Sequence, residues 1–383
     1  MQDTLSSRLV DRPALEWLQA LRGLAAFLVV LVHARGALTG SPLAEAVQEV
    51  LYHGAMGVDL FFILSGFLMV YTTRTLPGGV ADARVFLLKR IVRIWPAYAV
   101  LTVLTFLTLQ GVHGLVEPAG REALLKTLLF VPVDPYNPLY FSMALPVGWT
   151  LTFEMYFYVV FAAALLLGRW RWLGMAAWFG LTLLAVPMAL GHFDWGVFDQ
   201  AVIGQWAYAN LAINPMVWDF LFGMVAAWLY FHLPGPPTPR GAALLVLLPL
   251  AALVALAVAD VCSTHGPTQW GGPLALVFIG LAQSSKTQRL PTPRALLWLG
   301  EISYALYLAH PLAQHFLGLA VGRLAGTQAT HGPVYLLLAT GMSLVVGAWV
   351  WRHVEVPGSR LARRWLLPQR LAEAPPAIGP VSS

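Results

Sequence analysis

Charged residues are scarce in this chain, and cysteine is almost absent. Only 11% of its 383 residues are Asp, Glu, Lys or Arg, whereas soluble domains carry about 25%. The single cysteine, Cys262, excludes an internal disulfide framework and any cysteine-rich zinc site. No histidine or other base adjoins it in the sequence, so we interpret it as a small apolar residue near a span end rather than as a catalytic thiol.

Apolar residues are abundant instead, at 58%, and long apolar runs recur over the whole length. A segment that crosses a bilayer needs about 20 such residues in a helix, because every backbone amide must find its partner inside the segment. The sequence therefore predicts an all-α, polytopic membrane helix bundle. The first run is too long for a signal peptide, and it contains Arg22 and His33, which a cleavable apolar region would lack.

Ten segments fit this template. Most of the 23 Lys and Arg residues fall in alternate connections, and this asymmetry predicts that both termini are cytoplasmic. We expect a cytoplasmic segment at 1–14, a membrane domain at 15–357 and a partly disordered cytoplasmic tail at 358–383. The predicted spans are 15–37, 55–73, 94–112, 148–168, 172–190, 214–233, 241–260, 268–284, 297–322 and 333–353.

We single out seven of the ionisable side chains inside these spans, because a charge at the bilayer centre costs about 2.5 to 3.5 kcal/mol. Depth along the spans puts four of them within about 10 Å of the outer edge and the others nearer the middle or the inner half. Pro311, beside the deepest histidine, is expected to kink its helix. The outer four are His33, Asp59, Glu154 and Asp219, and the remaining three are Arg22, Glu301 and His310.

Arg22 and His33 share one face of the first span, because eleven residues at about 100° each come to about three full turns. They are separated by about 16 Å along the helix axis. His33 is the type of side chain that takes and returns a proton near neutral pH, and an outer-half carboxylate such as Glu154 would orient it. The pair predicts one wall of an internal cavity.

The net charge of +5 does not indicate nucleic-acid binding, because no basic face with interleaved aromatic residues accompanies it. Its densest part is Lys89, Arg90 and Arg93, before the predicted span 94–112. Arg90 and Arg93 are neighbours on a helix surface, and paired guanidinium groups suit phosphate. From the residues alone, an anchor on the cytoplasmic side is the simpler interpretation.

Seven motifs follow one another over about residues 15–360. They are Arg22 and His33 with ten residues between them, GVDLFFILSGFLM at 57–69, the Arg90 and Arg93 pair before Trp95 and Pro96, GWTLTFEMYFY at 148–158, NPMVWDFLFGM at 214–224, LGEISYALYLAHP at 299–311 and VEVP at 354–357. In this order they resemble the membrane-bound acyltransferase family 3.

This resemblance implies transfer of an acyl group, commonly acetyl, from cytoplasmic acyl-coenzyme A to a hydroxyl of an extracytoplasmic or membrane-associated carbohydrate. It implies the cytoplasmic membrane of a bacterium, contact with membrane lipid and polysaccharide-assembly proteins, and no resident cofactor. In the family, the histidine that matches His33 is the proposed catalytic base. The arginine that matches Arg22 is essential beside it. Those matching Arg90 and Arg93 contact the acyl donor, which we also expect of Arg22, and the glutamate matching Glu154 is functionally important.

We expect His33 to remove the proton of the acceptor hydroxyl as it attacks the thioester, with Glu154 or Asp59 holding the imidazole tautomer. A covalent acyl-histidine is the alternative. We expect no metal, because His33 and His310 lack a ligand set at fixed spacing.

Some positions depart from the family's pattern. Thr150 stands where serine is common, Met155 follows Glu154 where a second acid is frequent, and Asp219 replaces a more usual glutamate. Packing and function stay equally open for Asp219 and Glu301. Further polar candidates in the motifs are Ser65, Trp149, Thr150, Asp219, Ser303, Tyr304 and His310.

The acceptor and the length of the acyl chain stay open. Sugars of exopolysaccharide, lipopolysaccharide or peptidoglycan are compatible with the sequence, as is a macrolide-type small molecule. A proton-coupled secondary transporter is the alternative from another class, because intramembrane histidine and carboxylates also form proton relays. The chain lacks the internal repeats common in transporters, and its seven intramembrane ionisable residues disfavour a purely structural scaffold.

Overall fold

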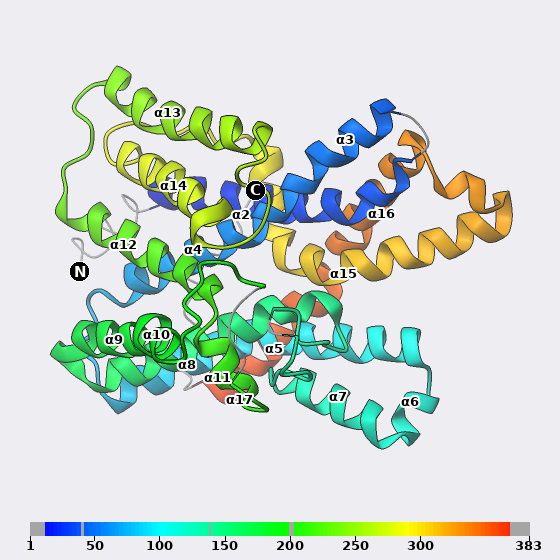
Figure 1. Ribbon diagram of the computed structural model, residues 1–383, viewed down its shortest axis with the longest axis horizontal. Helices are drawn as coiled ribbons and strands as arrows, with labels where there is room; N and C mark the ends of the chain where they lie inside the picture. The colour runs from blue at the N-terminus through cyan, green and yellow to red at the C-terminus, as the bar shows by residue number, and fades with distance from the viewer. Residues whose placement is uncertain (1–11, 40–41, 138, 199–202, 368–383) are drawn as a thin grey trace. The chain divides into compact units, whose positions relative to one another are not determined.

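The computed structural model describes residues 12–39, 42–137, 139–198 and 203–367. All regular structure within these ranges is helical, which confirms the all-α prediction (Figure 1). Most of the expected segment 1–14 and the end of the expected tail, from 368 on, lie outside the described residues.

Seven helical stretches in the described ranges are long and apolar enough to cross a bilayer, which confirms a polytopic membrane protein. The other three predicted spans are also helical, as α12, α14 and α15. The count of ten and the side of the termini stay predictions. The seven stretches are Glu16–Ala37, Leu43–Thr73, Val80–Gln110, Pro146–Leu166, Gly168–Ala189, Pro239–Val258 and Pro333–Leu366.

The chain forms two compact units, and the first is made of residues up to 74 together with 218–344. Long apolar helices build it, and α2 packs on α15 while α4 packs on α12. Its helices are α2 (Arg12–Ala34), α3 (Pro42–Tyr52), α4 (Gly57–Thr73), α12 (Trp218–His232), α13 (Pro239–Val258), α14 (Gly272–Ser284), α15 (Arg294–Ala325) and the start of α16 (Pro333–Val350).

Glycines allow the helices of the first unit to approach with their backbones in contact. A Cβ at Gly66 of α4 would lie 2.0 Å from the Phe220 carbonyl oxygen of α12, and a Cβ at Gly223 would lie 2.0 Å from that of Ile63. On α15, a Cβ at Gly300 would lie 2.1 Å from the Gln19 carbonyl oxygen of α2. Without a hydrophobic driving force between helices in lipid, such close packing is a principal source of association.

Within the described ranges, the second unit holds residues 75–217 and 345–367. In it α5 packs against α8 and α17. Its helices are α5 (Val80–Gln110), α6 (His113–Val116), α7 (Pro118–Leu128), α8 (Trp149–Leu166), α9 (Arg171–Gly180), α10 (Val186–Ala189), α11 (Ala207–Ala212) and α17 (Val356–Leu366).

The start of the predicted tail is a helix, α17, which follows a π-helical turn at Trp351–Glu355. The Ser359 hydroxyl donates to the Arg93 carbonyl of α5 over 3.4 Å, so α17 lies beside this part of α5.

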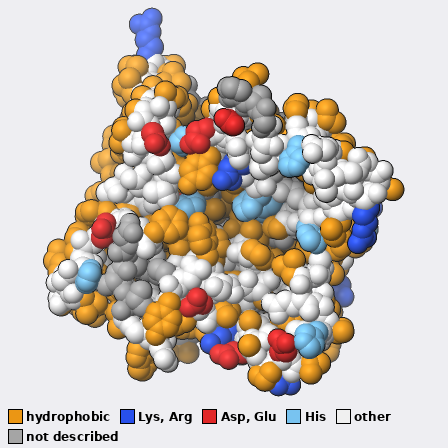
Figure 2. Space-filling view, turned by 45° about the vertical axis from the view of Figure 1, so that its right-hand side comes forward, with side chains coloured by type: hydrophobic (Ala, Val, Ile, Leu, Met, Phe, Trp, Pro, Cys, Tyr) orange, Lys and Arg blue, Asp and Glu red, His pale blue; other side chains and the backbone are white. Residues whose placement is uncertain are grey.

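Hydrophobic side chains cover much of the face drawn in Figure 2, and charged side chains occur there in small groups. Individual helices agree with this picture. On α13, for example, Leu244, Leu248 and Val254 are all exposed. Exposed apolar side chains of this kind are what a lipid-facing helix requires.

Candidate functional site

His33 lies at the end of α2, where its imidazole is exposed. Its Nδ1 is 2.8 Å from the Val29 carbonyl oxygen, one turn earlier on the same helix. A carbonyl oxygen only accepts hydrogen bonds, so Nδ1 carries the proton and donates. In the neutral ring Nε2 therefore holds the lone pair, which is the arrangement a general base requires.

His310 of α15 lies against this ring, with ring centroids 4.8 Å apart and the planes at 65°. Its side chain is 0% exposed, and its Nδ1 lies 3.2 Å from the Leu306 carbonyl oxygen. Its Nε2 is buried without a hydrogen-bond partner. The sequence placed the two histidines at different depths, but the structure makes them a pair.

A hydrogen-bonded glutamine lies one turn beyond His310 on α15. Gln314 donates from Nε2 to the Val30 carbonyl of α2, over 3.2 Å, and to the Ser343 hydroxyl of α16, over 3.4 Å. These bonds hold α15 against α2 close to the histidine pair, so the relative position of His33 and His310 is supported by polar contacts as well as by packing.

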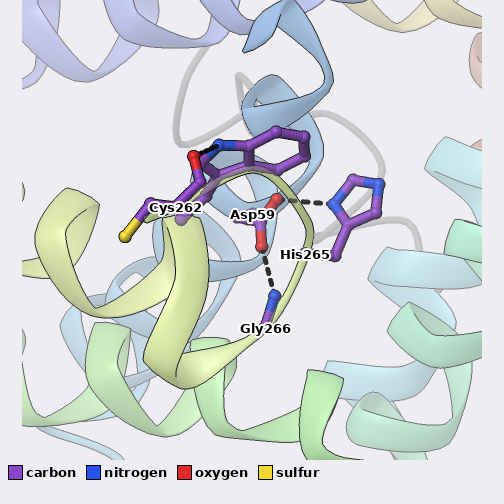
Figure 3. Close-up of polar contacts among 5 residues, drawn as sticks. Asp59, Cys262, His265 and Gly266 are labelled. Carbon is purple, nitrogen blue, oxygen red and sulfur yellow. Dashed lines mark hydrogen bonds and ion pairs between the residues drawn. The ribbon is translucent and has the colours of Figure 1, made fainter. Parts of the chain in front are cut away.

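Asp59, in the first turn of α4, is fully buried and faces the loop between α13 and α14 (Figure 3). It accepts from His265 Nδ1 over 2.7 Å and from the Gly266 amide over 3.0 Å. The Trp270 indole closes the same loop by donating to the Cys262 carbonyl, over 2.9 Å.

Asp219 of α12 lies next to this cluster. Both its carboxylate oxygens are buried without a hydrogen-bond partner, and Asp59 is the neighbouring charge that acts on it. Its Oδ1 is packed so tightly against Gly271 that a Cβ there would lie 2.0 Å away. Two carboxylates this close cannot both be ionised at low cost.

The expected contact between Asp59 and His33 is therefore replaced by other contacts. The carboxylate of Asp59 bonds to His265, and the imidazole of His33 is oriented by its own helix through Val29. The reason is local: a histidine near a helix end reaches the carbonyl four residues back, while the first turn of α4 faces the 260–271 loop.

Arg22 lies on the same uninterrupted helix as His33, so the predicted shared face exists as a helix face. Its side chain is half-buried, and Nη1 is 3.5 Å from the Gln19 side-chain oxygen. Glu301 on α15 is also half-buried.

In the second unit, Tyr158 joins two of the predicted site residues. The Arg90 guanidinium lies 5.2 Å from the centre of the Tyr158 ring and 5.4 Å from that of Phe86. The Tyr158 hydroxyl donates to the Glu154 carboxylate. Arg90 on α5 and Glu154 on α8 are thus parts of one contact network, which the sequence did not indicate.

The remaining predicted site residues differ in their burial and in their hydrogen-bond partners. Thr150 donates to the Val147 carbonyl over 3.1 Å, and Ser303 donates to that of Gly300 over 2.8 Å, so both hydroxyls bond within their own helical turns. Trp149 is buried against the Tyr140 ring, with centroids 5.4 Å apart. Ser65 and Tyr304 are half-buried.

His33 belongs to the first unit and Glu154 to the second, so their pairing stays a prediction. Sequence reasoning missed His265 and Tyr158. His265 lies outside every predicted span, where ionisable residues are ordinary, and Tyr158 lies in the motif at 148–158, where only its spacing of four residues from Glu154 marks it. Among the described residues, no group of three or more His, Cys, Asp or Glu side chains has a geometry suited to a metal ion.

Comparison with known proteins shows which family this chain belongs to. The model of a family described as "Acyltransferase domain" matches residues 15–352. The exopolysaccharide production protein ExoZ of Rhizobium meliloti is 29% identical over 334 residues, which cover 84% of this chain and 95% of ExoZ.

Two other curated proteins are similar over most of their length. Nodulation protein 10 of Rhizobium leguminosarum is 28% identical over 92% of this chain and 95% of its own. The putative membrane-bound transacylase BcsY of Komagataeibacter xylinus is 28% identical over 76% of this chain and 71% of its own. No solved structure is significantly similar.

Proposed function

The chain belongs to the acyltransferase-domain family, and from that membership we propose that it transfers an acetyl group from cytoplasmic acetyl-coenzyme A to a carbohydrate hydroxyl. The membership makes the protein an acyltransferase rather than a transporter or a scaffold. The acceptor in this proposal is a sugar of a bacterial exopolysaccharide, on the outer side of the cytoplasmic membrane or attached to it. The name of ExoZ, an exopolysaccharide production protein, supports this choice.

His33 is the proposed general base, and its hydrogen bond to Val29 is the observation that carries the proposal. As the acceptor oxygen bonds to the thioester carbon, its proton passes to Nε2 of His33. When the carbon–sulfur bond breaks, the departing thiolate takes this proton, and the imidazole returns to its neutral form. The Val29 carbonyl keeps Nδ1 protonated, which is the role that a carboxylate plays in many histidine-based sites.

The donor's phosphates are assigned to Arg90 and Arg93, with Arg22 as a further contact. Guanidinium groups bind phosphate through paired hydrogen bonds. Glu154 is assigned to the same machinery because Tyr158 joins it to Arg90. His310 is assigned to packing against the His33 ring, beside the bond to Val29 that orients it.

The test is transfer from radiolabelled acetyl-coenzyme A to cell-surface polysaccharide, in membranes that contain equal amounts of wild-type or variant protein. We expect His33→Ala to lower transfer by about 10²-fold or more, as loss of a general base does. His315→Ala is the matched control, because His315 is an exposed histidine on α15 with no assigned role. Undiminished transfer by His33→Ala would contradict the proposal.

The same assay separates direct transfer from a covalent intermediate. Without acceptor, an acyl-histidine would leave label on the wild-type protein after rapid denaturation at neutral pH and none on His33→Ala. Direct transfer leaves neither protein labelled. Mass spectrometry of the polysaccharide then identifies the esterified sugar.

A further inference from the structure

Helix α17, at the end of the last spanning stretch, brings a third arginine to the Arg90 and Arg93 pair. Helix α17 packs on α5 through Ser359, whose hydroxyl donates to the Arg93 carbonyl, and through Gly358, where a Cβ would lie 3.0 Å from the Pro96 ring. Arg363 follows Ser359 by four residues, so it lies on the same face of α17. Arg93 and Arg363 therefore lie on adjoining segments of α5 and α17, where their like charges interact.

These arginines are not arranged like surface anchors. Arg90, Arg93 and Arg363 are half-buried, whereas Arg360 and Arg364 on the same helix are exposed. Within the described residues, no carboxylate lies within ion-pair distance of Arg93 or Arg363. Half-buried like charges repel each other, and this repulsion costs free energy. An anion bound between them would replace the repulsion by attraction.

We propose that Arg363 of α17, together with Arg93 and Arg90 of α5, forms a site for the phosphate groups of the nucleotide part of the acyl donor. This inference rests on the proposed function and adds a residue from the end of the chain to the donor site. Phosphate is the anion that guanidinium forks bind best, through two parallel hydrogen bonds. The phosphate group of an anionic lipid offers the same chemistry, so the experiment must separate the two sources.

The measurement is the affinity of purified protein, in nanodiscs of zwitterionic lipid, for coenzyme A without an acyl group. We expect Arg363→Gln to raise Kd about tenfold or more, as the loss of one charge-assisted hydrogen bond would. Arg363→Lys keeps the charge but loses the fork, and its Kd should lie between the two. Arg364→Gln is the matched control, since it makes the same charge change on an exposed turn of α17, and its Kd should stay within about twofold of wild type.

A second measurement uses the reaction. Arg363→Gln should raise the KM for acetyl-coenzyme A and leave kcat and the KM for acetyl-pantetheine, which has no phosphate, near those of wild type. Equal Kd values for Arg363→Gln and Arg364→Gln in well-folded protein would overturn the assignment. If Arg363→Gln binds coenzyme A as tightly as wild type but is no longer stabilised by anionic lipid, the site binds a lipid headgroup. That result would also overturn the assignment to the acyl donor. Because coenzyme A binding needs no turnover, failure of acetyl transfer alone would count against the proposed function and not against this site.

Discussion

Asp59 and Asp219 are neighbouring buried aspartates, and replacing each by asparagine should change the free energy of unfolding by different amounts. Asp59 accepts two hydrogen bonds, from His265 Nδ1 and from the Gly266 amide. The Asp59→Asn substitution puts an amide donor opposite one of these donors. The lost charge-assisted bond should cost about 1.5 to 3 kcal/mol of the free energy of unfolding.

No donor group of a neighbouring residue reaches the Asp219 carboxylate oxygens, and the nearby Asp59 carboxylate makes a second negative charge there costly. Asp219→Asn keeps the shape and removes that repulsion, and the new amide donates toward a carboxylate. We expect its stability to lie within about 1 kcal/mol of wild type, or above it.

The assay is unfolding of purified protein in mixed micelles by titration with sodium dodecyl sulfate, followed by tryptophan fluorescence. A double-mutant cycle of Asp59→Asn with His265→Gln should give a coupling energy of about 1 kcal/mol or more, because the two side chains are in contact. If Asp219→Asn costs as much as Asp59→Asn, or if the coupling is zero, the account of this cluster is wrong.

Two further predictions concern Tyr158 and Cys262. Tyr158→Phe removes the hydroxyl that bonds to Glu154 and should lower acetyl transfer about tenfold. Tyr156→Phe on the same helix, whose hydroxyl accepts from the Trp178 indole, should transfer normally, and equal losses would contradict the Tyr158 network. Burial raises the pKa of the Cys262 thiol, so less thiolate is present near neutral pH, and maleimide labelling followed by mass spectrometry should be slow until the protein is unfolded. Rapid labelling of the native protein would show that the loop opens.

The sequence by itself determined the class of the fold and the positions of the histidine and arginine along their helices. Apolar runs of about 20 residues leave the backbone no alternative to a helix in lipid, so α2 could be predicted with Arg22 and His33 on one face. The motif order also indicated the family that the comparisons then showed. These inferences depend on contacts within one segment or on the order of segments.

Only the tertiary structure decided which side chains meet. His33 is paired with His310, on a helix far along the chain, and Asp59 with His265, in a loop. The first pair depends on how closely α2 and α15 approach, which Gly23 and Gly300 allow, and the second depends on where the loop between α13 and α14 folds back onto α4. The period of a helix specifies a face, but packing between distant segments selects its partner, and that selection cannot be read from either segment alone.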